Sequence, residues 1–262
     1  MNTMLIPSRF CGPPRSGNGG YVAGLLAEVL LGREIYGRGI TVTLRLPPPL
    51  DTVLPLIREE TGSVTVKTPN GAVMAHAELT EDLPVAPAAV DMQTADAATL
   101  GYRGRDDNPF SSCFTCGIGR EPGDALRIFA GSVAGRKDTV ATVWRPSADF
   151  SEAALNPDFS GSPHIIPARV VWAALDCPGA WAAGFDAARP IVLGRIKAVM
   201  HTPLVVEKES IVIGERRDQR GRKHFTATAL YATTGQLLAA AEAVWISIDP
   251  TTFAGLATPD AE

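Results

Sequence analysis

The chain contains an internal repeat, which constrains its fold more than any other feature of the sequence. The pattern Phe10-x-Gly12-x-Pro14 returns as Phe159-x-Gly161-x-Pro163, and each copy leads into an apolar stretch with helical spacing. Two further blocks repeat in the same order: "ITVTLRLP" at 40–47 with "IKAVMHTP" at 196–203, and "GAVMAHAE" at 71–78 with "GQLLAAAE" at 235–242. Three blocks in one shared order predict two copies of a single structural unit.

Each copy predicts one helix followed by antiparallel strands. In the first copy Asn18 precedes the apolar helical pattern and Gly32 can end it. In the second copy we expect a helix at about residues 166–183, which Pro178 should kink or end. Strands are expected at residues 40–46, 52–60, 62–68, 72–79, 138–146, 195–201, 205–217, 223–233 and 237–249. The pattern is that of an α+β fold.

The repeat divides the chain into three segments. We expect a first unit at residues 1–82 and a second unit at residues 124–262. Residues 83–123 are rich in Ala, Pro, Asp and Gly and have little periodicity, so they are predicted to be a linker wrapped around the two units.

Composition restricts the partners and the compartment. The formal net charge of −4 leaves no excess of basic side chains for a phosphate backbone, so nucleic acid is not an expected partner. The apolar run at residues 21–31 is about half the length that a membrane span needs. The first residues lack the pattern of a secretory signal, and four cysteines do not make a disulfide framework. We therefore expect a cytoplasmic protein without a membrane span.

The segments "FCGPP", "NGGYVAGLLAE", "FSGSP", "VVWAALDCPGAW" and "GQLLAAAEAVWISID", in this order, resemble the double-hotdog acyl-CoA thioesterase-like family. The resemblance implies two curved antiparallel sheets, each wrapped around a helix and joined edge to edge as a pseudo-dimer, with ligand tunnels between the helices. It also implies an acyl-CoA or other acyl thioester as substrate, hydrolysis without a cofactor or metal, and chains able to form homo-oligomers. A second copy in the same chain would cover the sheet edge that one copy leaves open.

Thioester hydrolysis needs hydrogen-bond donors for the oxyanion and a base near the carbonyl carbon. The start of the first helix, Asn18 to Tyr21, offers unpaired N–H groups, and Gly19 and Gly20 allow a close approach. Glu28 lies roughly 12 Å further along that helix, too far to share one carbonyl with Gly20. In a two-fold pseudo-dimer the opposing helix would instead bring Asp176 to Gly20, and Glu28 would face the start of the second helix.

The second helix begins with Pro167, Ala168 and Arg169 and has no glycine there, so we favour the Gly20 cleft. The single-hotdog 4-hydroxybenzoyl-CoA thioesterases are similar, with an acid eight residues after Gly-Gly that acts across the interface as nucleophile or general base. Burial would raise the pKa of such an acid, which suits a base. The expected catalytic residues are Asp176, Gly20 and Glu28, and the expected substrate-binding residues are Asn18, Gly19, Tyr21, His164 and Arg169.

Other double-hotdog thioesterases add a Thr or Ser and a Gln to the Asp. Here Gly194 and Arg195 stand near the first of those positions, and Glu242 and Ala243 near the second. This departure keeps open a non-catalytic protein that binds acyl-CoA or a lipid-like ligand. A hotdog hydratase would need a His five residues after the Asp, where this chain has Trp181, and a purely structural module is a further alternative.

Each of the remaining candidates has a structural alternative. Both helix acids can be inert, hydrogen-bonded carboxylates, and "NGGY" can be an ordinary helix start. Cys113-x-x-Cys116 is half of a zinc site or part of a packed linker. For Cys177 the two alternatives are a nucleophile with His164 as its base and a small buried side chain without a catalytic role. A basic hairpin either is a solvated turn or holds the phosphates of CoA through Arg216, Arg217, Arg220 or Arg222.

Overall fold

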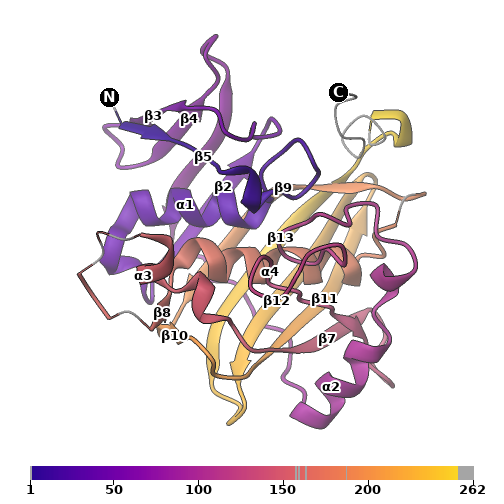
Figure 1. Ribbon diagram of the computed structural model, residues 1–262. Coiled ribbons are helices and arrows are strands. Elements are labelled where there is room, and N and C mark those ends of the chain that lie inside the picture. The colour runs from indigo at the N-terminus through magenta and orange to yellow at the C-terminus, as the bar shows by residue number, and fades with distance from the viewer. Residues whose placement is uncertain (1, 157, 159, 163, 187, 253–262) are drawn as a thin grey trace.

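A computed structural model of the chain describes residues 2–156, 158, 160–162, 164–186 and 188–252 (Figure 1). Phe159 and Pro163 of the repeated motif lie outside the described residues. The helices are α1 (Gly19–Leu31), α2 (Met92–Leu100), α3 (Glu152–Leu155) and α4 (Ala168–Ala182). The strands are β1 (Asn2–Met4), β2 (Gly39–Leu44), β3 (Leu54–Arg58), β4 (Val64–Lys67), β5 (Val73–Thr80), β6 (Gly131–Ser132), β7 (Thr139–Trp144), β8 (Ile165–Ile166), β9 (Ile191–Met200), β10 (Leu204–Val205), β11 (Ser210–Arg220), β12 (Lys223–Ala232) and β13 (Leu237–Ser247).

One 11-stranded antiparallel sheet runs through the molecule in the order β1-β3-β4-β5-β2-β9-β13-β12-β11-β7-β6. The two copies meet where β2 pairs with β9, and these strands carry the second block of the sequence repeat. Ile40 pairs with Ala198 and Val42 pairs with Ile196. The repeat matches Ile40 to Ile196 and Val42 to Ala198. Ile40 therefore pairs with the counterpart of Val42, and Val42 pairs with the counterpart of Ile40, as an isologous two-fold contact requires. The expected edge-to-edge pseudo-dimer is therefore observed.

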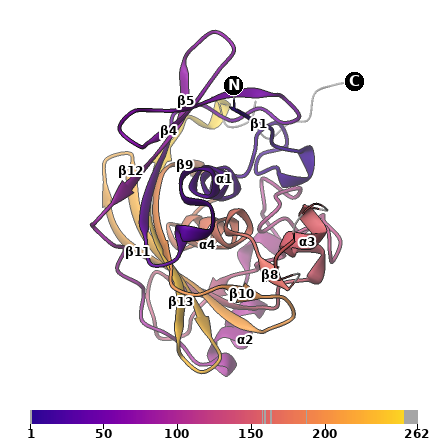
Figure 2. The ribbon, with the colours of Figure 1, turned by 90° about the vertical axis from the view of Figure 1, so that its left-hand side faces the viewer.

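Both long helices lie inside the curve of the sheet (Figure 2). The apolar face of α1 includes Val22, Ala23 and Leu26, all fully buried, and α4 is buried almost along its whole length. A helix enclosed on every side explains why α4 shows a nearly continuous apolar sequence. None of the described helices is both long and apolar enough to cross a membrane.

The helix boundaries agree with the sequence, except at Pro178. Asn18 caps α1, since its side-chain oxygen accepts a hydrogen bond from the Tyr21 N–H, and Gly32 follows the last residue of the helix. An end of the helix at Pro178 is wrong, because α4 continues to Ala182, while a kink there stays a prediction. Proline removes one N–H from the helix, but enclosure between the sheet and α1 holds the backbone in place.

Residues 83–123 pass around the sheet and include a helix that the sequence analysis did not predict. Along the outer face, the Tyr231 hydroxyl donates to the Pro87 carbonyl at 2.6 Å, and α2 covers Ile211 and Ile213 of β11. The chain then returns to the inner face, where Phe114 is fully buried beside Phe10. The described part of the linker therefore contributes to both faces of the sheet, while its exact boundaries stay a prediction.

Candidate active site

The two long helices cross in very close contact at two glycines of α1. A Cβ atom on Gly20 would lie 2.5 Å from the Trp172 carbonyl oxygen and 2.6 Å from Asp176 Cβ. A Cβ on Gly24 would lie 2.4 Å from Arg169 Cα. No side chain fits at either position without moving the opposite helix, so glycine is what lets the start of α1 approach the middle of α4.

That approach joins Gly20 to Asp176. The Gly20 N–H donates to Asp176 Oδ2 at 2.9 Å, and the carboxyl group is buried. Among the described residues, nothing donates to the second oxygen, Oδ1. Burial raises the pKa of Asp176 to about 7, although the hydrogen bond from Gly20 acts in the opposite direction. The result is an oriented carboxyl group with one free oxygen.

Asn18 and Gly19 complete the start of α1. The Asn18 Oδ1 atom is engaged by the Tyr21 N–H at 2.9 Å, and its Nδ2 atom donates to Cys113 Sγ at 3.9 Å. Gly19 is the first helical residue, and the first N–H groups of a helix have no carbonyl partner within it. The positive end of the α1 dipole therefore lies beside the Asp176 carboxyl group.

A largely apolar cavity of about 390 Å³ opens over this pair. Asn18, Gly19 and Asp176 line it together with Ala180, one helical turn beyond Asp176. Gly20 is not among the described lining residues, and its N–H is hydrogen-bonded to the carboxyl group. The volume is in the range of small-molecule sites, with few polar groups in an apolar wall. The remaining lining residues include Leu44, Leu46, Phe110, Phe185, Leu193, Ile246 and Ile248.

The equivalent position of the second copy is built differently. Glu28 Oε1 accepts from the Arg169 N–H at 2.9 Å, as Asp176 does from Gly20, but Glu28 Oε2 also lies 2.7 Å from the Arg169 guanidinium. Glu152 pairs with the same guanidinium at 3.3 Å. A separate cavity of about 400 Å³ adjoins Glu28 and Glu152. Here the carboxylate is neutralised by an arginine, so the two clefts have different chemistry.

Three of the expected substrate-binding residues do not reach the Asp176 cavity. The ring of Tyr21 stacks on Phe10 with 4.0 Å between centroids and lies near Arg169. Arg169 belongs to the Glu28 cleft, and His164 is exposed in the loop before β8. His164 is absent from the described lining residues of both cavities. It therefore does not lie beside Cys177, where a base would have to be.

The positions that hold Thr or Ser and Gln in other double hotdogs supply no such groups here. Gly194 lines the cavity without a side chain, and Glu242 is turned to Lys197 at 2.9 Å. In the basic hairpin, for which CoA-phosphate binding and a solvated turn were both open, three arginine side chains are paired with acids. These pairs are Arg216 with Asp138, Arg217 with Glu215 and Arg220 with Asp218.

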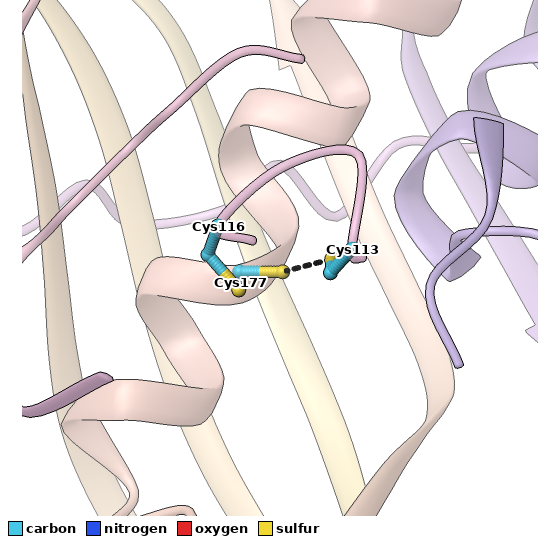
Figure 3. A group of neighbouring side chains, drawn as sticks. All are labelled: Cys113, Cys116 and Cys177. Atoms are coloured by element: carbon cyan, nitrogen blue, oxygen red, sulfur yellow. Dashed lines mark hydrogen bonds between the residues drawn. The ribbon is translucent and has the colours of Figure 1, made fainter. Parts of the chain in front are cut away.

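Sequence reasoning missed that three cysteines meet at the edge of the Asp176 cavity (Figure 3). Cys113 and Cys116 come from the linker and Cys177 from α4, and their sulfur atoms all lie within 4.8 Å of one another. A hydrogen bond with the Cys113 thiol lowers the pKa of Cys116. The pKa of Cys177 is raised by hydrogen bonds with the Cys113 and Cys116 thiols and by burial. Two features of the sequence could have predicted this cluster: Cys177 follows Asp176 directly, and Cys113 and Cys116 have Cys-x-x-Cys spacing.

The fold has many relatives of known structure. No protein-family model and no curated protein sequence matches this chain. A tesB protein of Mycobacterium avium subsp. paratuberculosis is similar in structure at 11% identity, with a TM-score of 0.58 over 94% of this chain and 92% of its own. An acyl-CoA thioesterase II of Mycobacterium marinum aligns at 12% identity, with a TM-score of 0.55 over 95% and 93%.

The P1711L variant of the GphF dehydratase aligns with 15% identity and a TM-score of 0.55 over 94% of this chain and 92% of that one. The shared architecture thus hosts both hydrolysis and dehydration, and the activity has to be argued from the site residues. The expected α+β architecture is confirmed: the chain has the double-hotdog fold of thioesterase II proteins.

Proposed function

We propose that the chain hydrolyses an acyl thioester in the cavity between α1 and α4, with Asp176 as the base. The observation that carries the proposal is the buried Asp176 carboxyl group at the wall of an apolar cavity: the Gly20 N–H orients one of its oxygens, and the other has no donor among the described residues. A water molecule held by Oδ1 would attack the thioester carbonyl carbon while Asp176 accepts its proton.

The start of α1 supplies the electrostatic part of this mechanism. With Gly20 holding Asp176, the N–H of Gly19 and the positive end of the helix dipole lie beside the cavity and would stabilise the oxyanion. Collapse of the tetrahedral intermediate then breaks the C–S bond, and the leaving thiolate takes up a proton. The apolar wall suits the acyl chain of the substrate, and an acyl-CoA is the substrate class that we propose. A site in the cytoplasm fits this substrate.

The second candidate is an acyl-CoA or lipid-like ligand binder without catalysis. It is favoured by one observation, that the Gly20 N–H is occupied by Asp176 and not presented to the cavity. The structural module of the sequence analysis is disfavoured, because the cleft beside Asp176 is an open cavity of about 390 Å³ and not a packed interface.

Incubation with a panel of acyl-CoA substrates, with free thiol measured against time, tests the proposal. The matched pair of variants is Asp176→Asn, which keeps an acceptor for the Gly20 N–H but cannot take a proton, and Glu28→Gln in the other cleft. We expect Asp176→Asn to lower kcat by roughly 10²–10⁴-fold and Glu28→Gln to retain turnover. Ligand binding without thiol release by the unmodified protein would establish the binder instead. Full activity of Asp176→Asn would disprove the assigned role.

A further inference from the structure

The cluster of Cys113, Cys116 and Cys177 is held by a rigid frame. Cys113 N–H donates to the Phe110 carbonyl at 2.9 Å, and the Cys116 carbonyl accepts from the Tyr102 hydroxyl at 2.8 Å. The loop between the two linker cysteines is docked on α4 through Thr115 Oγ1, which donates to the Ala173 carbonyl at 3.0 Å.

The turn that follows Cys116 leaves no room for a side chain. A Cβ on Gly117 would lie 2.4 Å from the Ser111 carbonyl oxygen and 2.5 Å from that of Cys113. The sequence Cys-Phe-Thr-Cys-Gly therefore forms a tight loop that directs both of its thiols toward α4, where Cys177 meets them (Figure 3). Side chains positioned this closely are preorganised for a shared ligand.

The spacing of the sulfur atoms is that of a metal site. Cys113 Sγ and Cys177 Sγ are 3.7 Å apart, and all three atoms lie within 4.8 Å of one another. Two thiolates at about 2.3 Å from a tetrahedral Zn²⁺ are separated by about 3.8 Å. The first pair already has this separation, and the wider pairs need to close by no more than about 1 Å.

Two donors around the cluster would compensate the negative charge of three thiolates. Asn18 Nδ2 donates to Cys113 Sγ at 3.9 Å. The indole N–H of Trp181 is buried near the Cys116 thiol, whose pKa it lowers, but it makes no hydrogen bond of ordinary length and angle to an acceptor among the described residues. A buried N–H without an acceptor is rare in a folded protein, and a metal-bound thiolate sulfur would provide one.

We propose that Cys113, Cys116 and Cys177 bind a thiophilic divalent metal ion, Zn²⁺, which fastens the linker to α4 at the wall of the cavity. Three protein ligands leave a fourth coordination position, and since all three cysteines line the cavity, that position faces its interior. Water or a polar group of a bound molecule would occupy it. Nothing in this proposal depends on thioester hydrolysis.

The test measures bound metal in the full-length, reduced protein. The chain is purified with a thiol-free reductant, dialysed against Zn²⁺ and then against metal-free buffer, and its zinc content is determined by mass spectrometry. We expect one zinc per chain in the unmodified protein. Cys11 provides the matched control, because it is buried nearby but donates to the Ser112 carbonyl at 3.2 Å and stands outside the cluster. Cys11→Ser should keep one zinc, and Cys177→Ser should lose it.

Cobalt gives a second, spectroscopic measurement. Co²⁺ bound by three thiolates in tetrahedral geometry produces sulfur-to-metal charge-transfer bands, which Cys11→Ser should retain and Cys116→Ser should lose. If Cys177→Ser does not fold, as judged by circular dichroism, the comparison of Cys116→Ser with Cys11→Ser decides the question. A reduced protein that takes up no zinc, or cluster variants that bind as much zinc as Cys11→Ser, would overturn the proposal. A disulfide that forms among these thiols while no metal binds would also overturn it.

Discussion

Removal of one partner of the ion pair between Glu28 and Arg169 should destabilise the fold more than the partial exposure of the two side chains suggests. Burial alone would lower the pKa of Arg169, but Glu28 and Glu152 together raise it, so the charged guanidinium depends on its carboxylate partners. Burial also raises the pKa of Glu28 against the attraction of Arg169. The pair as a whole therefore gains little, whereas removal of one partner leaves the other charge poorly compensated.

The variant Glu28→Gln isolates the charge. Glutamine keeps an oxygen that can accept from the Arg169 N–H, so only the attraction to the guanidinium is lost. Two unit charges about 4 Å apart interact by about 4 kcal/mol at an effective dielectric constant near 20, which is an upper limit. The side chains are 23% and 11% exposed, and Glu152 still pairs with Arg169. We expect the free energy of unfolding to fall by about 1–3 kcal/mol.

Urea unfolding followed by tryptophan fluorescence measures this change. The matched control is Glu207→Gln, which removes an ion pair of nearly the same length, 2.8 Å to Arg145, but with side chains that are 60% and 49% exposed. Glu207→Gln should lower the free energy of unfolding by no more than about 0.5 kcal/mol. The double variant Glu28→Gln with Arg169→Gln should cost less than the sum of its single changes. Equal losses for Glu28→Gln and Glu207→Gln would refute the argument from burial.

Three further changes follow from the packing around α4. Gly24→Ala should lower the free energy of unfolding by about 1–3 kcal/mol, because its Cβ would lie 2.4 Å from Arg169 Cα, while Gly101→Ala, 3.5 Å from its nearest neighbour, should be nearly neutral in the same urea titration. Thr228→Val should cost about 1 kcal/mol, since Thr228 Oγ1 donates to the Leu175 carbonyl at 2.8 Å; the exposed Thr233→Val is the comparison, and equal effects would argue against the bond. If the cavity holds an acyl chain, Ala180→Leu should reduce kcat/KM for long acyl-CoA substrates more than for short ones, and a uniform reduction would contradict that placement.

The double-hotdog fold could be predicted because the sequence contains two copies of the same pattern of helix and strands. Equivalent positions in the two copies must occupy equivalent places, so the match of Glu28 with Asp176 was enough to place Asp176 opposite the start of α1. The Gly20 N–H lies 2.9 Å from Asp176, and the Arg169 N–H lies 2.9 Å from Glu28, as the two-fold relation between the copies predicts. The capping role of Asn18 was also readable, because it depends only on residues within one helical turn.

Other features depend on contacts that no local pattern contains. The direction of the Tyr21 ring is set by Phe10 and Phe114, which surround it. Helix α2 follows Asp91, whose side chain accepts from Thr94 N–H at 2.7 Å, so a cap and an alanine-rich run were available but were obscured by the surrounding prolines. The meeting of the three cysteines follows from the path of the linker, which has no counterpart in the repeat.

The path of the linker has an evolutionary consequence. A homodimer of identical hotdog subunits would carry any added loop at both of its symmetry-related pockets or at neither. Fusion into one chain removes that restriction: among the described lining residues, those of the segment between the copies, such as Cys113, line the pocket of Asp176 and not the pocket of Glu28. Gene duplication could thus give a single molecule two pockets free to acquire separate tasks, one shaped by the intervening segment and the other by an arginine.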